Sequence, residues 1–441
     1  MEAILKIKGL KSYYYSGQNV IPAVDGVDLD IYPGEIVGIV GESGCGKSTV
    51  VRSLMGLLDP VSSKREGGQA IYLGKDLFQM KEKELCRIRG KEISMIFQNP
   101  LSALDPVYTI GDQIVEIIRI HEKISKKEAY EKAVFLLKQV KIPSPEVRIQ
   151  QYPHELSGGM QQRVMIAIAL ACNPKVLIAD EPTTALDVTI QAQILSLLKE
   201  LRDQLGIAVI LITHNMGVVA AVCDRMLVMY GGAVVEEGKC TELFENPCHP
   251  YTRGLLAAIP SIKERKEKLY TIPGQVPKMK VPVQYCRFCS RCSYAQEVCH
   301  EKEPGMQGEN GHLYKCFYTP QQQEEEKAGL LGFGEAEMIL MLLHVAEAEN
   351  AHDPADEGDH EHHDEGQRIR KECGGLMAFQ HEEIEVDHTG QLAERETHGQ
   401  PVAYIHGHVQ DEHEQGEIEH GHQGLEGTVR RYGQHEAAVQ G

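Results

Sequence analysis

Residues 41–49 read GESGCGKST and follow residues 35–40 (EIVGIV), a short β-branched run that predicts a buried strand. A helix is predicted over residues 48–58, so the order is strand, glycine-rich loop, helix. Four residues fill the pattern G-x-x-x-x-G-K-[ST]: Gly41, Gly46, Lys47 and Ser48. Glycine-rich loops without a phosphate are common, but a loop in this context is typical of phosphate binding.

Each part of this loop has a physical role in binding ATP and Mg²⁺. Glycines, Gly44 among them, let backbone N–H groups turn towards the phosphates, and the helix N-terminus adds partial positive charge. Lys47 reaches the β and γ phosphates, and the Ser48 hydroxyl binds Mg²⁺ next to Thr49. Cys45 lies at the same positive helix end, which favours its thiolate. We therefore expect alkylation of Cys45 to block the site and ATP to protect it.

A second apolar run, residues 176–180 (VLIAD), ends in an acid and is followed by another, Glu181. Two acids after a strand are often only a helix cap. Together with the phosphate loop, they predict that Asp180 holds the Mg²⁺ shell and that Glu181 polarises the attacking water.

Strands and helices alternate along most of the chain. The first 30 residues predict strands, and the pattern predicts helices over 110–120, 126–140 and 190–205 and a strand over 208–213. Such alternation predicts an α/β fold with a largely parallel sheet covered on both faces.

Charge and composition exclude several classes of protein. The net charge is −19 over 441 residues, but residues 321–441 hold 28 of the 64 acidic and 7 of the 45 basic residues. The remaining 36 acidic and 38 basic residues give a nearly neutral body, without the basic excess of a nucleic-acid-binding protein. No signal peptide or uninterrupted membrane-spanning apolar run is found. Twelve cysteines in such a chain are better explained as thiols or metal ligands than as disulfides.

Residues 156–163 (LSGGMQQR) identify the family. Alone, Ser157, Gly158 and Gly159 would be an ordinary helix N-terminus. The segment resembles the signature of ABC ATPases, and the resemblance extends over about residues 1–320. It implies a P-loop ATPase domain over 1–246, with a β-subdomain and a helical subdomain at about 99–160. It also implies that the signature faces the γ-phosphate bound by an opposite subunit, so that the site is completed in a dimer.

Further positions match motifs of this family, although each has an ordinary structural interpretation by itself. Gln98 resembles the glutamine that contacts the γ-phosphate and metal. Asp187 resembles the residue that contacts the partner subunit, although it would also serve as a helix cap. His214 resembles the switch histidine at the γ-phosphate, although lone histidines are more often structural.

An aromatic residue near the N-terminus matches the position that stacks on adenine in the family. Tyr14 occupies this position, and its neighbours Tyr13 and Tyr15 are the alternatives.

Residues 99–107 (NPLSALDPV) and 248–260 (CHPYTRGLLAAIP) resemble the ATPase subunits of oligopeptide and dipeptide permeases and of nickel importers. The resemblance implies a peripheral protein at the cytoplasmic face of the membrane that energises uptake of peptides or a related solute. Its implied partners are two membrane permease subunits, a second ATPase, with a paralogue favoured over a second copy, and indirectly an extracytoplasmic solute-binding protein. Alternatives are a nickel importer or a soluble ABC ATPase without a transport role.

Five cysteines lie close together in an expected C-terminal extension over residues 247–320. They suggest either zinc or an iron–sulfur cluster. Spacing alone favours Cys286, Cys289 and Cys292 as ligands. The resemblance to peptide permeases instead implies a [4Fe–4S] cluster, with Cys289 spare, held by Cys286, Cys292, Cys299 and Cys316.

Residues 321–441 form an acidic tail that holds 14 of the 20 histidines and few apolar residues. Such a composition predicts disorder and no contribution to ATP hydrolysis or transport. A histidine-rich metal buffer and an accidental extension of the reading frame are the alternatives.

Overall fold

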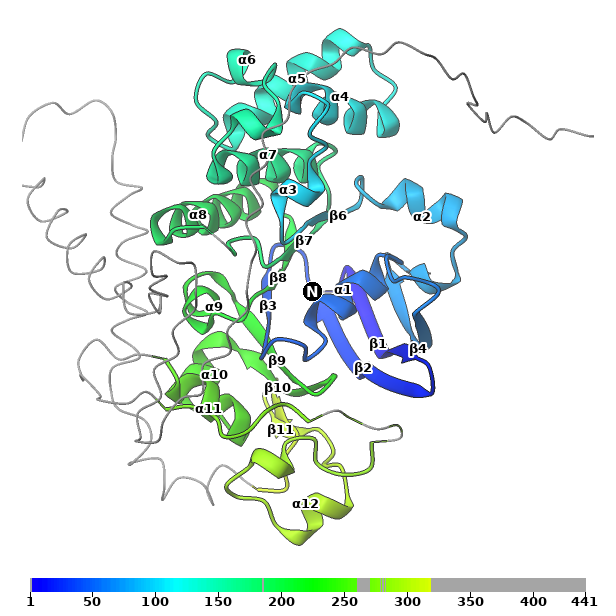
Figure 1. The fold of residues 1–441 in the computed structure, drawn as a ribbon, viewed down its shortest axis with the longest axis vertical. Coiled ribbons are helices and arrows are strands. Elements are labelled where there is room, and N and C mark those ends of the chain that lie inside the picture. Colours follow the sequence, from blue (N-terminus) through cyan, green and yellow to red (C-terminus); the bar gives the residue numbers. More distant parts are fainter. Residues whose placement is uncertain are drawn as a thin grey trace, which may run out of the picture. The chain divides into compact units, whose positions relative to one another are not determined.

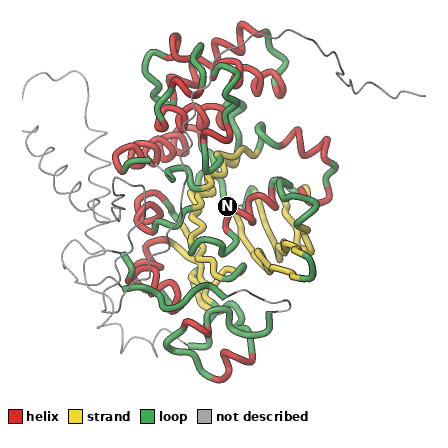
Figure 2. Tube along the Cα trace, in the orientation of Figure 1, coloured by secondary structure: helices red, strands yellow, loops and turns green. Residues whose placement is uncertain are grey.

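The computed structural model describes residues 2–184, 186–259, 270–277, 279, 281 and 283–318, which all fall in one compact unit (Figures 1 and 2). The predictions made for residues 321–441 lie outside the described residues.

The main sheet has eight strands in the order β11-β12-β10-β9-β3-β8-β7-β6. Strands β9, β3, β8, β7 and β6 are parallel neighbours, and β10, β12 and β11 extend the sheet in antiparallel fashion. The parallel strands are β3 (Ile36–Val40), β6 (Ile93–Ile96), β7 (Val176–Asp180), β8 (Ala208–Ile212) and β9 (Arg225–Tyr230). The antiparallel strands are β10 (Ala233–Lys239), β11 (Gln307–Glu309) and β12 (His312–Tyr314).

The parallel strands are buried on both faces, which explains their continuous apolar sequences. Val37 and Ile39 of β3 belong to one apolar core, and Ile36 and Val40 to the other. This arrangement confirms the prediction of a largely parallel α/β sheet.

A smaller antiparallel sheet, in the order β2-β1-β4-β5, contributes to the core that contains Val37 and Ile39. Its strands are β1 (Leu5–Ser16), β2 (Asn19–Ile31), β4 (Ser63–Tyr72) and β5 (Lys75–Asp76). The same core includes α1 (Lys47–Leu54), the helix that follows the phosphate loop. The strands predicted in the first 30 residues are thus confirmed.

Helices dominate the region between β6 and β7, and Figure 1 shows them grouped together. They are α3 (Pro100–Ala103), α4 (Ile110–His121), α5 (Lys126–Gln139), α6 (Pro145–Arg148) and α7 (Gly158–Leu170). Thr109 and Ser125 cap α4 and α5 through their hydroxyl oxygens. The predicted helices over 110–120 and 126–140 are confirmed, and the one over 190–205 is α8 (Val188–Leu205).

The remaining helices are α2 (Glu82–Ile88), α9 (Met216–Val222), α10 (Cys240–Glu245), α11 (Pro250–Ala257) and α12 (Glu297–Glu301), with short 3-10 turns at Leu77–Gln79, Pro153–Glu155 and Cys289–Arg291. The cysteine-rich segment also forms the hairpin β11–β12, which pairs with β10 through Glu236 and Tyr314. This hairpin was not predicted from the sequence. No helix within the described ranges is both long and apolar enough to cross a membrane.

Candidate nucleotide site

The residues predicted to bind the phosphates and Mg²⁺ gather at the carboxyl ends of four adjacent parallel strands. The phosphate loop follows β3, His214 follows β8, Asp180 ends β7 and Gln98 follows β6. This edge of an open parallel sheet is where ligands bind in α/β folds.

The phosphate loop requires glycine where its backbone passes closest to neighbouring chain. Gly46 has φ +104°, and a Cβ there would lie 2.0 Å from the carbonyl oxygen of Ala23. Lys47 is buried, and its Nζ donates to the carbonyl oxygens of Gly41 at 2.7 Å and Glu42 at 2.9 Å. The ammonium is thus held within the loop that is expected to receive the phosphates.

Ser48 and Asp180, the two predicted Mg²⁺ residues, are in direct contact. The Ser48 hydroxyl donates to Oδ1 of Asp180 at 2.8 Å. Burial raises the pKa of Asp180, and the hydrogen bond from Ser48 partly opposes this shift. A hydroxyl and a buried carboxylate so placed fit an oxygen-ligated Mg²⁺ ion, which would also stabilise the ionised carboxylate.

Glu181 lies at the centre of a second group of polar side chains. Gln98 Nε2 donates to Oε2 of Glu181 at 2.9 Å, and His214 Nδ1 lies 3.2 Å from Oε1. Thr184, which none of the sequence motifs indicates, donates to Oε2 at 3.0 Å. Burial works to raise the pKa of Glu181, but the hydrogen bonds from His214 and Thr184 lower it below its usual value. Glu181 is therefore an ionised carboxylate at neutral pH, as a residue that polarises water must be.

The signature residues stand apart from this group. Ser157 caps α7, its Oγ accepting from the N–H of Met160 at 3.4 Å, and Ser157 and Gly158 are exposed. Asp187 caps α8 by accepting from the N–H of Ile190 at 2.9 Å. The caps by Ser157 and Asp187 agree with the ordinary structural interpretation of both motifs, and their role towards a partner subunit stays a prediction.

The three consecutive tyrosines of β1 differ in their contacts. Tyr13 donates to Asp25 at 2.8 Å and Tyr15 to Glu66 at 2.6 Å. Tyr14 is partly exposed. With both neighbours engaged elsewhere, Tyr14 stays the candidate for stacking on adenine.

The prediction that the positive helix end favours the thiolate of Cys45 is wrong. Only 1% of Cys45 is exposed, and a Cβ on Gly41 would lie 2.8 Å from its sulfur. Burial raises the pKa of the thiol, and the nearby Lys47 opposes this only in part. Desolvation therefore outweighs the positive potential of the helix N-terminus.

We expect Cys45 to react with a thiol reagent such as DTNB far more slowly than Cys86, with or without ATP. Cys86 is exposed, whereas the thiol of Cys45 is buried and protonated. The fast phase of the reaction should lose the contribution of one thiol in Cys86→Ser and keep its full size in Cys45→Ser. A smaller fast phase in Cys45→Ser would contradict this expectation.

The five closely spaced cysteines surround one cavity. Besides the thiols, the cavity is lined by apolar and aromatic residues, and its cysteines are Cys286, Cys289, Cys292, Cys299 and Cys316. All five are free of disulfides. The structure thus gathers the four predicted cluster ligands and places Cys289, predicted to be spare, beside them.

The thiols have surroundings suited to a metal cluster. Backbone N–H groups of Tyr294 and Tyr318 donate to the sulfurs of Cys292 and Cys316, both at 3.4 Å. Such bonds tune iron–sulfur clusters. Burial raises the pKa of Cys286 to about 12 and that of Cys292 to about 11. These thiols are protonated without metal, so metal binding would release protons.

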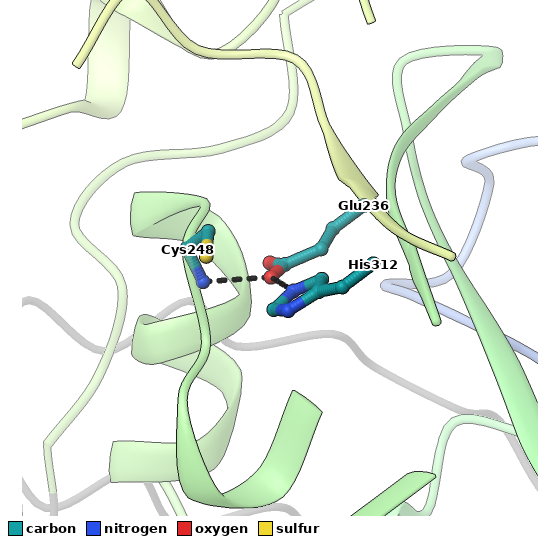
Figure 3. A group of neighbouring side chains, drawn as sticks. All are labelled: Glu236, Cys248 and His312. Carbon is teal, nitrogen blue, oxygen red and sulfur yellow. Dashed lines mark hydrogen bonds and ion pairs between the residues drawn. The ribbon is translucent and has the colours of Figure 1, made fainter. Parts of the chain in front are cut away.

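A separate group of metal-ligand side chains, Glu236, Cys248 and His312, anchors the C-terminal hairpin (Figure 3). Oε1 of Glu236 accepts from the backbone N–H of Cys248 at 2.6 Å and lies 2.7 Å from Nε2 of His312. Its Oε2 accepts from the N–H of His249 at 2.9 Å. Both oxygens of this buried carboxylate already have protein partners, so the group acts as an anchor for β12 and for the start of α11.

We expect the stability of the protein to fall as the pH rises from about 6.5 to 10, in part because His312 loses its proton. Hydrogen bonding to Cys248 and Glu236 raises the pKa of His312 to about 10, compared with about 6.5 in the unfolded chain. A histidine whose pKa is raised by folding stabilises the folded protein fully when the pH is below its pKa in the unfolded chain. This stabilisation is lost as the pH rises through its pKa in the folded protein. Thermal unfolding of His312→Gln should show a shallower pH dependence, and His300→Gln, on an exposed residue, should keep the original slope. Equal slopes for all three proteins would contradict this interpretation.

Comparison with known proteins agrees with the motifs. A family model described as ABC transporter matches residues 24–184, and one described as oligopeptide/dipeptide transporter, C-terminal region, matches residues 235–299. The chain is 47% identical to the oligopeptide transport ATP-binding protein AppD of Bacillus subtilis, over 74% of this chain and 100% of that one. It is 46% identical to the dipeptide transport ATP-binding protein DppD of the same species, over 74% and 97%. It is 45% identical to the oligopeptide transport ATP-binding protein OppD of Escherichia coli, over 72% and 93%.

Proposed function

Since the chain belongs to the ATP-binding proteins of ABC transporters and hydrolyses ATP as they do, we propose that it energises the uptake of di- or oligopeptides. The observation that carries this proposal is the grouping of Lys47, Ser48, Asp180 and Glu181 at one sheet edge, in a chain that also matches the oligopeptide/dipeptide C-terminal region.

On the basis of this arrangement, we assign the steps of hydrolysis to particular residues. The loop at Gly41–Thr49 and Lys47 would bind the phosphates, and Ser48 and Asp180, together with Gln98, would hold Mg²⁺. Glu181 would accept a proton from the attacking water, and His214, 3.2 Å away, would orient that carboxylate. Mg²⁺, when bound, offsets the negative charge that develops on the phosphates.

A dimer would complete the site. The exposed N-terminus of α7, with Ser157 to Gly159, presents N–H groups that suit a phosphate. These groups would meet the nucleotide of a second ATPase, for which a paralogue is the favoured candidate. Two membrane permease subunits would dock on the helical region near Gln98, on the cytoplasmic face, and a solute-binding protein would deliver the peptide from outside.

The cysteine cavity would hold a [4Fe–4S] cluster. Free thiols, an apolar lining and N–H donors to two of the sulfurs support this assignment. The proposed ligands are Cys286, Cys292, Cys299 and Cys316.

Transport can be tested by reconstitution into liposomes with the permease subunits and the solute-binding protein. We expect ATP-dependent uptake of labelled di- or oligopeptides and no uptake with the Lys47→Ala subunit, because that change removes the ammonium from the phosphate loop. Uptake of Ni²⁺ but of no peptide would overturn the assignment to peptides, and ATP-driven uptake with Lys47→Ala would overturn the assignment of the site.

A further inference from the structure

The C-terminal segment contacts the phosphate loop at Glu42, the second residue of the loop. The backbone N–H of Glu42 donates to the hydroxyl oxygen of Tyr251 at 2.8 Å. Its carboxylate forms a two-pronged ion pair with Arg291, with Nη1 2.7 Å from Oε2 and Nη2 3.1 Å from Oε1. Main chain and side chain of one loop residue are therefore both held by residues more than 200 positions later in the chain.

Arg291 is itself held rigidly. It is buried, it lies in the turn between Cys289 and Cys292, and its Nε donates to the carbonyl oxygen of Pro273 at 2.8 Å. Its guanidinium lies 5.7 Å from the ring centre of Tyr230. Because these contacts hold Arg291 in one conformation, its side chain loses little conformational entropy when the planar guanidinium binds a carboxylate through two N–H groups.

An aromatic cluster connects the cysteine cavity to the same loop. The ring centres of Tyr230, Tyr251 and Phe288 lie 4.7 to 5.4 Å apart, and all three side chains are buried. Phe288 lines the cysteine cavity, and Tyr251 reaches Glu42. Tyr251 is positioned in turn by His249, whose Nδ1 accepts from the N–H of Tyr251 at 3.1 Å.

We propose that Arg291 and Tyr251 are positioning residues for ATP, through which the cysteine-rich segment sets the shape and charge of the phosphate loop. The proposal rests on the proposed role of this loop in ATP binding. Glu42 brings a negative charge close to the place where the phosphates bind, and Arg291 neutralises it. Tyr251 fixes the backbone at the start of the loop, so that the following N–H groups are arranged before nucleotide arrives. Damage to the cysteine-rich segment is then expected to weaken ATP binding at a distance.

The alternative is that these contacts only attach the C-terminal segment to the core. In that case their loss lowers the stability of the protein and leaves the affinity of the folded protein for ATP unchanged. The two roles separate when the Kd for a fluorescent nucleotide, mant-ATP, is measured with Mg²⁺ on full-length variants whose thermal unfolding is measured in parallel.

Arg291→Gln should bind mant-ATP about tenfold more weakly, because the carboxylate of Glu42 then lies unpaired near the phosphates and repels them. Adding Glu42→Gln should recover part of that affinity, because no unpaired carboxylate then remains near the phosphates. The Kd of Arg291→Lys for mant-ATP should lie between those of the wild type and of Arg291→Gln. The matched control is Glu303→Gln, which alters the partner of Arg287 in the same segment and should leave the Kd unchanged. If Arg291→Gln does not fold, Tyr251→Phe removes one hydroxyl and should weaken binding by about fivefold.

The proposal is overturned if folded Arg291→Gln, or folded Tyr251→Phe, binds mant-ATP as wild type does. It is also overturned if the fold-changes in Kd of the two single variants, Arg291→Gln and Glu42→Gln, multiply in the double variant. The same holds if Glu303→Gln weakens binding as much as Arg291→Gln does. Wild-type protein that does not bind mant-ATP would overturn the proposed function together with this inference.

Discussion

Glu181→Gln should bind ATP with nearly the wild-type affinity and hydrolyse it about a hundredfold more slowly, or slower still. The amide keeps the size of the side chain and leaves Lys47, Ser48 and Asp180 in place, so the phosphate and metal contacts persist. It has no negative charge with which to accept a proton from water. Turnover should be measured in the assembled transporter, with mant-ATP binding measured separately.

A carboxylate just before the start of β6, Glu92, serves as the control. Glu92 accepts from the hydroxyl of Tyr72 at 3.0 Å and pairs with Lys175 at 3.4 Å, away from the group around Glu181. Glu92→Gln should therefore hydrolyse ATP at the wild-type rate. Near wild-type turnover in Glu181→Gln would exclude Glu181 as the general base.

Cys292→Ser should abolish the brown colour of anaerobically purified protein, whereas Cys289→Ser should keep it. Wild-type protein should contain about four irons per chain, as a cluster held by four thiolates requires. Both cysteines line the same cavity, so the two variants disturb the surroundings similarly and differ mainly in the proposed ligand role. Iron and acid-labile sulfide can be quantified beside the absorption spectrum.

Two results would contradict the ligand assignment. Zinc without iron in the wild-type protein would replace the cluster by a structural zinc site. Loss of iron in Cys289→Ser would show that Cys289 is not spare and would favour the set that spacing alone suggests, Cys286, Cys289 and Cys292.

The local sequence determined the class of the fold, the phosphate loop and most of the helices. The loop between β3 and α1 could be predicted because its glycines, lysine and serine all lie within residues 41–48, and each is required by local backbone geometry or by phosphate chemistry. The helices α4 and α5 were readable for a similar reason, since apolar periodicity and capping residues act within a few turns.

Burial and long-range partners were decided only by the tertiary structure. Cys45 illustrates burial: the sequence places it at a positive helix end, but packing against the Gly41 backbone removes it from water and raises its pKa. The ion pair of Arg291 with Glu42 illustrates long-range partners. Nothing in the local sequence of either residue indicates the other, because the contact depends on how the C-terminal segment packs on the main sheet. Desolvation and contacts between distant segments are properties of the packed chain, and a local pattern contains neither.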